Sequence, residues 1–260
     1  MQGTEPAVLL MEEEGVASIV FNRPQRLNAF DADFAQCFLE VCERLRCRAD
    51  LAAIVLQGRG RAFMAGGDIS AFQHSPAQVV ETLIRPMNRA LQILVEHPAP
   101  VIASVQGAAA GAGMSIALAC DLVIAARSAR FDFAYLKLAA SCDLGMSWHL
   151  PRLVGLRKAL EIALLGEPLT ALDAQELGLV NWVVEDERLA LRTQLVAERF
   201  TVMPRPALGE IKRLLRHGAP TLQGQLEQEA QAFARVMSSD AFKVAVSGFL
   251  SKPSARQPAR

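Results

Sequence analysis

The chain has 260 residues, of which 52% are apolar and 21% charged, and its 27 Lys and Arg residues balance 27 Asp and Glu residues. This composition is typical of a globular protein and excludes a disordered chain. The zero net charge argues against a general nucleic-acid binder, whose surface would be basic. The five cysteines form no CxxC pair, and the N-terminus lacks the basic and apolar regions of a secretory signal. We therefore expect a cytoplasmic protein without a zinc site.

Strands and helices alternate in the first part of the chain. Residues 8–21 form two apolar runs around a Glu-Glu-Glu-Gly turn, which predicts a hairpin. Apolar residues at helical spacing predict a helix over 31–48 with Asp31 as its N-cap. A buried strand over 52–57 and a helical stretch over 76–96 follow. This rhythm predicts an α/β fold.

The apolar stretch over 99–126 is long enough to suggest a membrane span. It contains three glycines, Gln106 and Asp121, and it lacks flanking aromatic or basic anchors. We therefore expect no contact with a membrane, but a buried strand over 101–105, a glycine-rich loop, a buried helix and a strand over 122–125.

After Pro151 the patterns are mainly helical and amphipathic. We expect a core domain over residues 1–200, and a helical region over 201–260 that needs a partner surface. The predicted helices cover residues 157–165, 171–177, 186–199, 206–216, 222–237 and 240–250.

Two glycine-rich loops each follow a predicted strand. GAAAGAGMS, residues 107–115, lacks the Lys-Ser/Thr pair of a P-loop and the GxGxxG spacing of a dinucleotide site. The start of the following helix would offer unpaired N–H groups to a carbonyl oxygen that becomes anionic during a reaction. The alternative is that the small residues only allow close packing of the helix. The second loop, FMAGGDIS at residues 63–70, could aim another N–H at the same oxygen.

Six segments along nearly the whole chain form a recognisable set: FNRPQRLNAF, RAFMAGGDIS, VQGAAAGAGMSIALACDLVIAA, ARFDFAYLKLAASCDLG, LPRLVGLRKALEIALLGEPLTALDAQELGLVNWVV and a closing FLSKP. Together, and in this order, they resemble the enoyl-CoA hydratase/isomerase (crotonase) superfamily. Within it they look most like the phenylacetate-pathway epoxyphenylacetyl-CoA isomerases.

The resemblance implies a spiral of repeated ββα units and C-terminal helices that form a homotrimer or a dimer of trimers. It implies an acyl-CoA thioester substrate and no further cofactor, because coenzyme A is part of the substrate. The oxyanion donors would be the N–H groups of Gly67 and Ala112. The other substrate-binding positions carried over are Arg23, Arg26, Ala29, Ala65, Asp68, Ile69, Tyr135, Phe249 and Lys252.

The chain departs from the family's hydratases at both catalytic glutamates. Ser115 and Tyr135 stand at those two positions, and neither can act as a carboxylate base near neutral pH. Asp143 matches the position where several members that are not hydratases carry their acting carboxylate. The resemblance therefore predicts an isomerase in which Asp143 removes a proton from the acyl chain and returns it at another carbon. An apolar pocket would raise the pKa of this carboxyl, which suits such a shuttle.

Other interpretations stay open. Asp143 could simply cap a helix. The chain could be a hydratase with an atypical site, a hydrolase, a dehalogenase with Asp143 as nucleophile, or a non-catalytic acyl-CoA-binding homologue. His149 is expected to be packed rather than to act as a base. The sequence assigns no role to His74.

Overall fold

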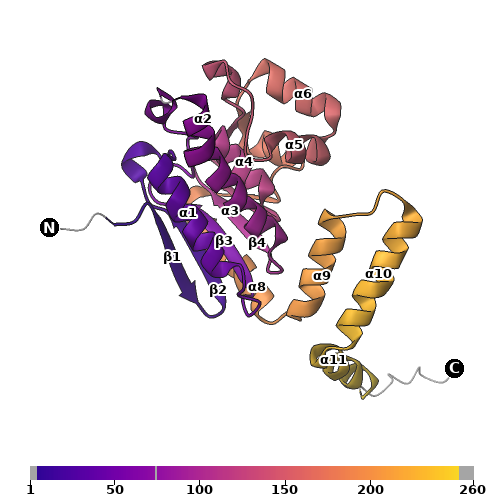
Figure 1. The fold of residues 1–260 in the computed structure, drawn as a ribbon. Coiled ribbons are helices and arrows are strands. Elements are labelled where there is room, and N and C mark those ends of the chain that lie inside the picture. The colour runs from indigo at the N-terminus through magenta and orange to yellow at the C-terminus, as the bar shows by residue number, and fades with distance from the viewer. Residues whose placement is uncertain (1–4, 74, 252–260) are drawn as a thin grey trace.

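The structure is a computed structural model, and it describes residues 5–73 and 75–251 (Figure 1). Its main sheet has six strands in the order β1-β2-β3-β4-β6-β9, and a smaller sheet has the order β5-β7-β8. The β1–β2 pair is antiparallel, whereas the other pairs of the main sheet are parallel. The strands are β1 Val8–Glu13, β2 Val16–Phe21, β3 Ala53–Gly58, β4 Val101–Val105, β5 Ala108–Ala110, β6 Leu122–Ala126, β7 Arg130–Asp132, β8 Leu169–Thr170 and β9 Trp182–Val184.

Helices cover both faces of the main sheet. Along β3, Ile54 and Leu56 join the core cluster that also contains residues of α1 and α3, while Ala53 and Val55 pack in a second cluster with α8. This alternation follows from the two-residue period of a strand that is buried on both faces. The helices are α1 Ala32–Leu45, α2 Pro76–Val79, α3 Arg85–Glu96, α4 Ala112–Ala119, α5 Met146–Val154, α6 Leu156–Leu165, α7 Ala171–Glu176, α8 Leu189–Thr201, α9 Arg205–Arg216, α10 Leu222–Met237 and α11 Asp240–Leu250.

The structure confirms the predicted α/β class, the opening hairpin and the helix capped by Asp31, whose side chain accepts a hydrogen bond from the Phe34 N–H. The helical stretch over 76–96 differs in detail, because a π-helical turn at Val80–Ile84 separates α2 from α3. Pro86, near the start of α3, has no N–H to donate, so the regular α-helical ladder cannot run through it. The strands β5, β7, β8 and β9 were not predicted, since two or three residues are too few to show an alternating pattern.

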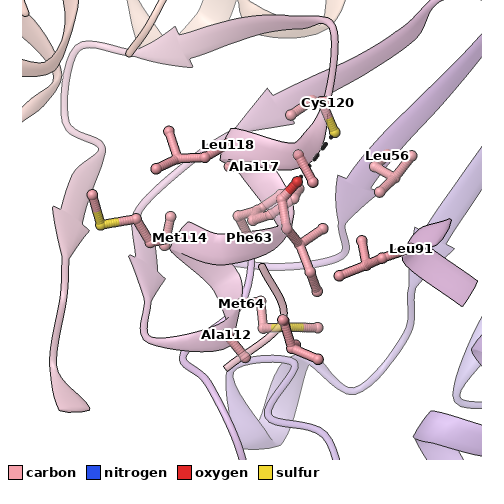
Figure 2. Packing of buried hydrophobic residues seen from close by; sticks show 14 of the residues in the cluster. Leu56, Phe63, Met64, Leu91, Ala112, Met114, Ala117, Leu118 and Cys120 are labelled. Carbon is pink, nitrogen blue, oxygen red and sulfur yellow. Dashed lines mark hydrogen bonds between the residues drawn. The ribbon is translucent and has the colours of Figure 1, made fainter. Parts of the chain in front are cut away.

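Helix α4 is the buried helix expected between β4 and β6, and all of its residues are buried. Figure 2 shows Ala112, Met114, Ala117 and Leu118 of this helix packed among core side chains that include Met64. The stretch that could have suggested a membrane span is thus the strand β4, a glycine-rich segment that contains the short strand β5, the core helix α4 and the strand β6. Within residues 5–73 and 75–251, the helices lack the combined length and hydropathy that a membrane crossing needs.

The C-terminal helices contact the core mainly through α9. Asp121, which follows α4, forms ion pairs with Lys212 at 2.8 Å and Arg216 at 2.7 Å. In contrast, α10 and α11 extend away from the sheet (Figure 1), and large apolar side chains such as Phe233 and Val244 are exposed on them. The helices predicted after Pro151 are all present, with shifts of a few residues at their ends.

Candidate active site

Hydrogen bonds between backbone groups hold the two glycine-rich loops side by side. The Met64 N–H donates to the Ala108 carbonyl at 3.0 Å, and the Ala110 N–H donates to the Met64 carbonyl at 2.9 Å. The loop after β2 joins them, because Phe30 pairs with the Gly66–Asp68 segment through two bonds of 3.0 and 2.8 Å. Three segments that are distant in sequence therefore meet at one point.

Close packing at this junction requires glycine. A Cβ atom at Gly113 would lie 2.1 Å from the Met64 carbonyl oxygen, which is far inside van der Waals contact. Gly111, with φ of 51°, makes the turn that starts α4. The packing interpretation of the small residues thus applies to Gly113, and it does not compete with a role for the N–H of its neighbour Ala112.

Gly67 and Ala112 belong to two loops that approach closely, and their N–H groups are available as donors. Ala112 is the first residue of α4, so its N–H has no acceptor within the helix. A Cβ atom at Gly66 would lie 4.0 Å from the Ala112 nitrogen, which shows how closely the two loops approach. Among the described residues, neither N–H donates a hydrogen bond to another group. The positive end of the α4 dipole adds to the preference for an anionic oxygen.

A cavity of about 530 Å³ opens beside these amides. Its wall is mostly apolar, with a few polar groups, as expected for a site that binds an acyl chain and orients one reacting group. Its lining residues are Ala65, Gly66, Gly67, Ile69, Phe72, Gly111, Ala112, Ala134, Tyr135, Lys137, Leu138, Ala140, Ser141 and Asp143.

Asp143 lies in the wall of this cavity and is largely buried. Its Oδ1 accepts a hydrogen bond of 2.6 Å from the Tyr135 hydroxyl. Burial raises the pKa of the Asp143 carboxyl above its ordinary value, and the bond from Tyr135 only partly offsets this effect. The helix-cap alternative is wrong, because α5 starts after Gly145 and receives no side-chain cap.

Tyr135 and Ser115 complete a polar cluster around this carboxyl. The Ser115 Oγ lies 2.8 Å from the Tyr135 hydroxyl oxygen, and Ser115 is fully buried on α4. Burial and the neighbouring carboxylate of Asp143 raise the pKa of Tyr135 far above its ordinary value, so the phenol stays protonated and acts as a donor. The sequence showed that both residues replace glutamates of the hydratases, but it did not show that they touch each other or Asp143.

The backbone around this cluster is strained. Ala134, Ala139 and Leu144 all have φ near 50°, a left-handed conformation that costs a residue with a Cβ about 1 kcal/mol or more. These residues flank Tyr135 and Asp143, so the strain lies where the two side chains are brought together. Strain of this kind is concentrated at functional sites in many proteins.

The predicted binding residues near the N-terminus lie beside the cavity rather than in its wall. Arg26 forms an ion pair of 2.6 Å with Asp68, which directly follows Gly67. Arg23 forms an ion pair with Asp31 at 2.6 Å and donates to the Ala29 carbonyl at 3.0 Å. Arg23 therefore stabilises the loop itself, and the more exposed Arg26 is the cation near the loop that contains Gly67.

The remaining candidates differ in where they lie. Ala65 and Ile69 line the cavity as predicted. Phe249 belongs to α11, the helix that extends away from the sheet (Figure 1), and its exposed side chain does not line the cavity. Lys252 and His74 lie outside the described residues. His149 is partly buried on α5, where burial and the nearby Arg216 lower its pKa to about 4.

Phe72 is a lining residue that the sequence analysis missed. A Cβ atom at Gly67 would lie 2.5 Å from the Phe72 ring, so this ring covers the loop at Gly67. No local sequence signal distinguishes Phe72 from a core phenylalanine. In the described part of the chain, His, Cys, Asp and Glu side chains form no group of three or more that could hold a metal ion.

Comparisons with known proteins identify the family to which the chain is similar. Residues 11–257 match the family model of the enoyl-CoA hydratase/isomerase family. The chain is 38% identical to 1,2-epoxyphenylacetyl-CoA isomerase of Escherichia coli K12, over 95% of this chain and 96% of the relative. It is 32% identical to 4-chlorobenzoyl coenzyme A dehalogenase-2 of an Arthrobacter species, over 84% and 81% of the two chains. The crystal structure of an enoyl-CoA hydratase from Mycobacterium smegmatis superposes with a TM-score of 0.89, with 31% identity over 95% of this chain and 97% of that one.

Proposed function

Because the chain belongs to the enoyl-CoA hydratase/isomerase family and is an enzyme of that family, we propose that it is an acyl-CoA isomerase with Asp143 as its single proton shuttle. The observation that carries this proposal is the partly buried Asp143 carboxyl, which shares one mostly apolar cavity with Gly67 and Ala112. The substrate is an unsaturated or ring-derived acyl-CoA. The relative named 1,2-epoxyphenylacetyl-CoA isomerase supports this substrate class.

The reaction proceeds in two proton transfers. In the first, the Asp143 carboxylate takes a proton from the carbon next to the thioester, and the electron pair of that C–H bond moves toward the carbonyl oxygen. The N–H groups of Gly67 and Ala112 hold the resulting anionic oxygen, and this electrostatic stabilisation is the main source of rate enhancement in such sites. In the second transfer, Asp143 returns the proton to a more distant carbon, and the double bond has moved.

The polar groups of the cavity disfavour hydration. A hydratase must hold and activate a water molecule with carboxylates, but Ser115 and Tyr135 are bonded to each other and neither carries a negative charge. Dehalogenation would need Asp143 as a nucleophile. Its raised pKa and its bond to Tyr135 favour a group that takes and returns a proton over one that forms a covalent bond.

The proposal includes a homo-oligomer. Helices α10 and α11 expose Phe233, Val244 and Phe249, which is unfavourable for a monomer in water. A trimer, or a dimer of trimers, would cover these side chains and would bring Phe249 to a neighbouring subunit. Light scattering of the purified protein coupled to size-exclusion chromatography tests this part, because a stable monomer would contradict it.

A paired assay tests the function. The purified protein and its Asp143→Asn variant are compared for conversion of a 3-enoyl-CoA to the 2-enoyl-CoA and of 1,2-epoxyphenylacetyl-CoA to its isomer, with crotonyl-CoA hydration measured in parallel. Asn has the shape of Asp and can still accept the bond from Tyr135, but it cannot carry a proton. Asp50→Asn serves as the control, because Asp50 is a surface carboxylate paired with Arg48.

We expect the wild type and Asp50→Asn to isomerise at least one of these substrates, and Asp143→Asn to lose at least about 1,000-fold in kcat, as when an essential proton-transfer group is removed. Fast hydration that does not depend on Asp143 would contradict the proposal. If acyl-CoA binds in calorimetry but no substrate turns over, the non-catalytic alternative is favoured.

A further inference from the structure

Side chains from three separate elements form one hydrogen-bonded chain at the candidate site. Ser115 lies on α4, Tyr135 begins the turn Tyr135–Leu138, and Asp143 lies in the loop before α5. We propose that Tyr135 and Ser115 are positioning residues that hold Oδ1 of Asp143, so that only Oδ2 exchanges protons with the substrate. This inference rests on the proposed isomerase function.

One arrangement of the protons uses the shortest contacts in this hydrogen-bonded chain. Tyr135 has one hydroxyl proton, and it donates this proton to Asp143 Oδ1 at 2.6 Å. The Tyr135 oxygen is then free to accept from Ser115, whose Oγ lies 2.8 Å away. The other acceptors near Ser115 Oγ are the carbonyls of Asp143 and Gly111, at the longer distances of 3.2 and 3.3 Å. Each bond of such a chain polarises and strengthens the next one.

The arrangement persists through the proposed catalytic cycle. The buried phenol of Tyr135 keeps its proton, so it donates to Oδ1 both when Asp143 is charged and when Asp143 carries a proton on Oδ2. A carboxyl group held at one oxygen cannot rotate freely. Its second oxygen thus stays directed at the acyl chain, which lowers the entropy loss of each proton transfer.

The other ionisable groups near Asp143 are occupied or neutral. In the same cavity, Lys137 forms an ion pair of 2.5 Å with Asp132 on β7. From α5, the His149 ring packs against Gly145, and burial lowers its pKa to about 4, so the ring is neutral near pH 7. From the 3-10 turn and from α4, the groups in contact with Asp143 are Tyr135 and Ser115. Tyr135 is thus the side-chain donor that counteracts the effect of burial on the pKa of the Asp143 carboxyl.

Two variants each remove one hydroxyl group from the hydrogen-bonded chain of Ser115, Tyr135 and Asp143. Tyr135→Phe keeps the ring, which packs edge to face on Phe133 with a centroid distance of 5.1 Å, and it deletes only the hydroxyl. Ser115→Ala deletes the donor to Tyr135 and leaves the bond between Tyr135 and Asp143 in place. Leu136→Ala is the control, because this exposed side chain follows Tyr135 directly and does not line the cavity.

The first readout is the titration of Asp143 itself, followed by carbon-13 NMR of the enzyme labelled at its Asp carboxyl carbons. Asp143→Asn identifies the signal by its disappearance. Because the hydroxyl of Tyr135 stabilises the charged carboxylate, we expect the Asp143 pKa to move upward in Tyr135→Phe, to move upward less in Ser115→Ala, and to stay unchanged in Leu136→Ala. An unchanged pKa in Tyr135→Phe overturns the proposal.

The second readout is kinetic. We expect kcat of Tyr135→Phe to fall about 10- to 100-fold, as for loss of one charge-assisted hydrogen bond, with KM nearly unchanged and the acidic limb of the pH profile moved to higher pH. A purely structural role would change stability or KM without moving this limb, and that result would also overturn the proposal.

The two readouts separate this inference from the proposed function. If the wild type has no isomerase activity but Tyr135→Phe raises the Asp143 pKa, the isomerase function fails while Tyr135 still holds the carboxyl. If the wild type isomerises and neither variant changes kcat or the titration, the positioning role fails while the function stands.

Discussion

Adding one methyl group at Gly113 tests whether the position of α4 sets the candidate oxyanion site. In Gly113→Ala the new Cβ would lie 2.1 Å from the Met64 carbonyl oxygen, whereas ordinary contact begins at about 3.4 Å. The helix start and the Met64 loop must therefore separate by about 1.3 Å. The carbonyl of Met64 also accepts the Ala110 N–H, so this movement strains the bond that joins the two loops.

The size of the effect follows from this displacement. Overpacking a tight core contact destabilises a protein by about 1–3 kcal/mol. A shift of more than 1 Å would also turn the Ala112 N–H away from the oxygen it is proposed to hold. Losing one oxyanion donor lowers kcat by about 100- to 1,000-fold. We expect Gly113→Ala to lose about 2 kcal/mol in the free energy of unfolding and at least about 100-fold in kcat.

Ala112→Gly is the matched comparison, because it removes a methyl group from the neighbouring residue and keeps its N–H. It should lower stability by less than about 1 kcal/mol, through the lower helix propensity of glycine, and leave kcat within about threefold. Urea unfolding and isomerase kinetics measure both variants. The reasoning is refuted if Gly113→Ala retains normal kcat, or if Ala112→Gly loses activity while it stays folded.

Two further predictions concern the core beneath α9. Asp121→Ala removes the carboxylate that pairs with Lys212 and Arg216, and it leaves the nearly buried Lys212 ammonium uncompensated. Urea unfolding should show that the free energy of unfolding falls by about 3–5 kcal/mol. A fall of less than about 1 kcal/mol would contradict the prediction. Burial, and to a smaller extent Arg216 and Arg152, lowers the pKa of His149 from 6.5 to about 4. Folding therefore favours the neutral ring. The contribution of His149 to the free energy of unfolding is present above pH 6.5 and is lost as the pH falls toward 4. His149→Gln should reduce the loss of stability between pH 7 and pH 4 by about 2 kcal/mol after solvent screening, and equal pH slopes for the two proteins in urea unfolding would contradict this.

Much of this fold could be predicted because its signals are local. The glycines, the Asp31 cap and the apolar period of α1 depend on residues a few positions apart, and the structure confirms them. The position of Asp143 could be predicted for a different reason, since the ARFDFAYLKLAASCDLG segment matches the family without a gap. A local pattern alone left Asp143 ambiguous, because an aspartate two residues before a glycine is equally typical of a turn or a helix start.

The contacts that give the site its chemistry could not be predicted, because they join residues that are far apart in sequence. Ser115 is 20 residues from Tyr135, and Arg26 is 42 residues from the Asp68 with which it pairs. No periodicity encodes such distances, and only the folded loops bring these side chains together. The π-helical turn before α3 also escaped prediction, since the effect of Pro86 on the ladder depends on how the surrounding helix packs.

Ser115 and Tyr135 explain both why the site lacks the two glutamates of a hydratase and how it holds Asp143. In a hydratase, Ser115 and Tyr135 would be glutamates that hold a water molecule; here they are neutral hydroxyl groups that hold each other and then Asp143. Replacing two carboxylates by hydroxyls removes negative charge around Asp143, so this carboxyl can ionise in a buried position without repulsion from a second acid. Under the proposed function, the loss of hydration chemistry and the gain of a single proton shuttle would therefore be one change rather than two. Restoring one acid by Ser115→Glu should raise the Asp143 pKa further and suppress isomerisation, without creating a hydratase.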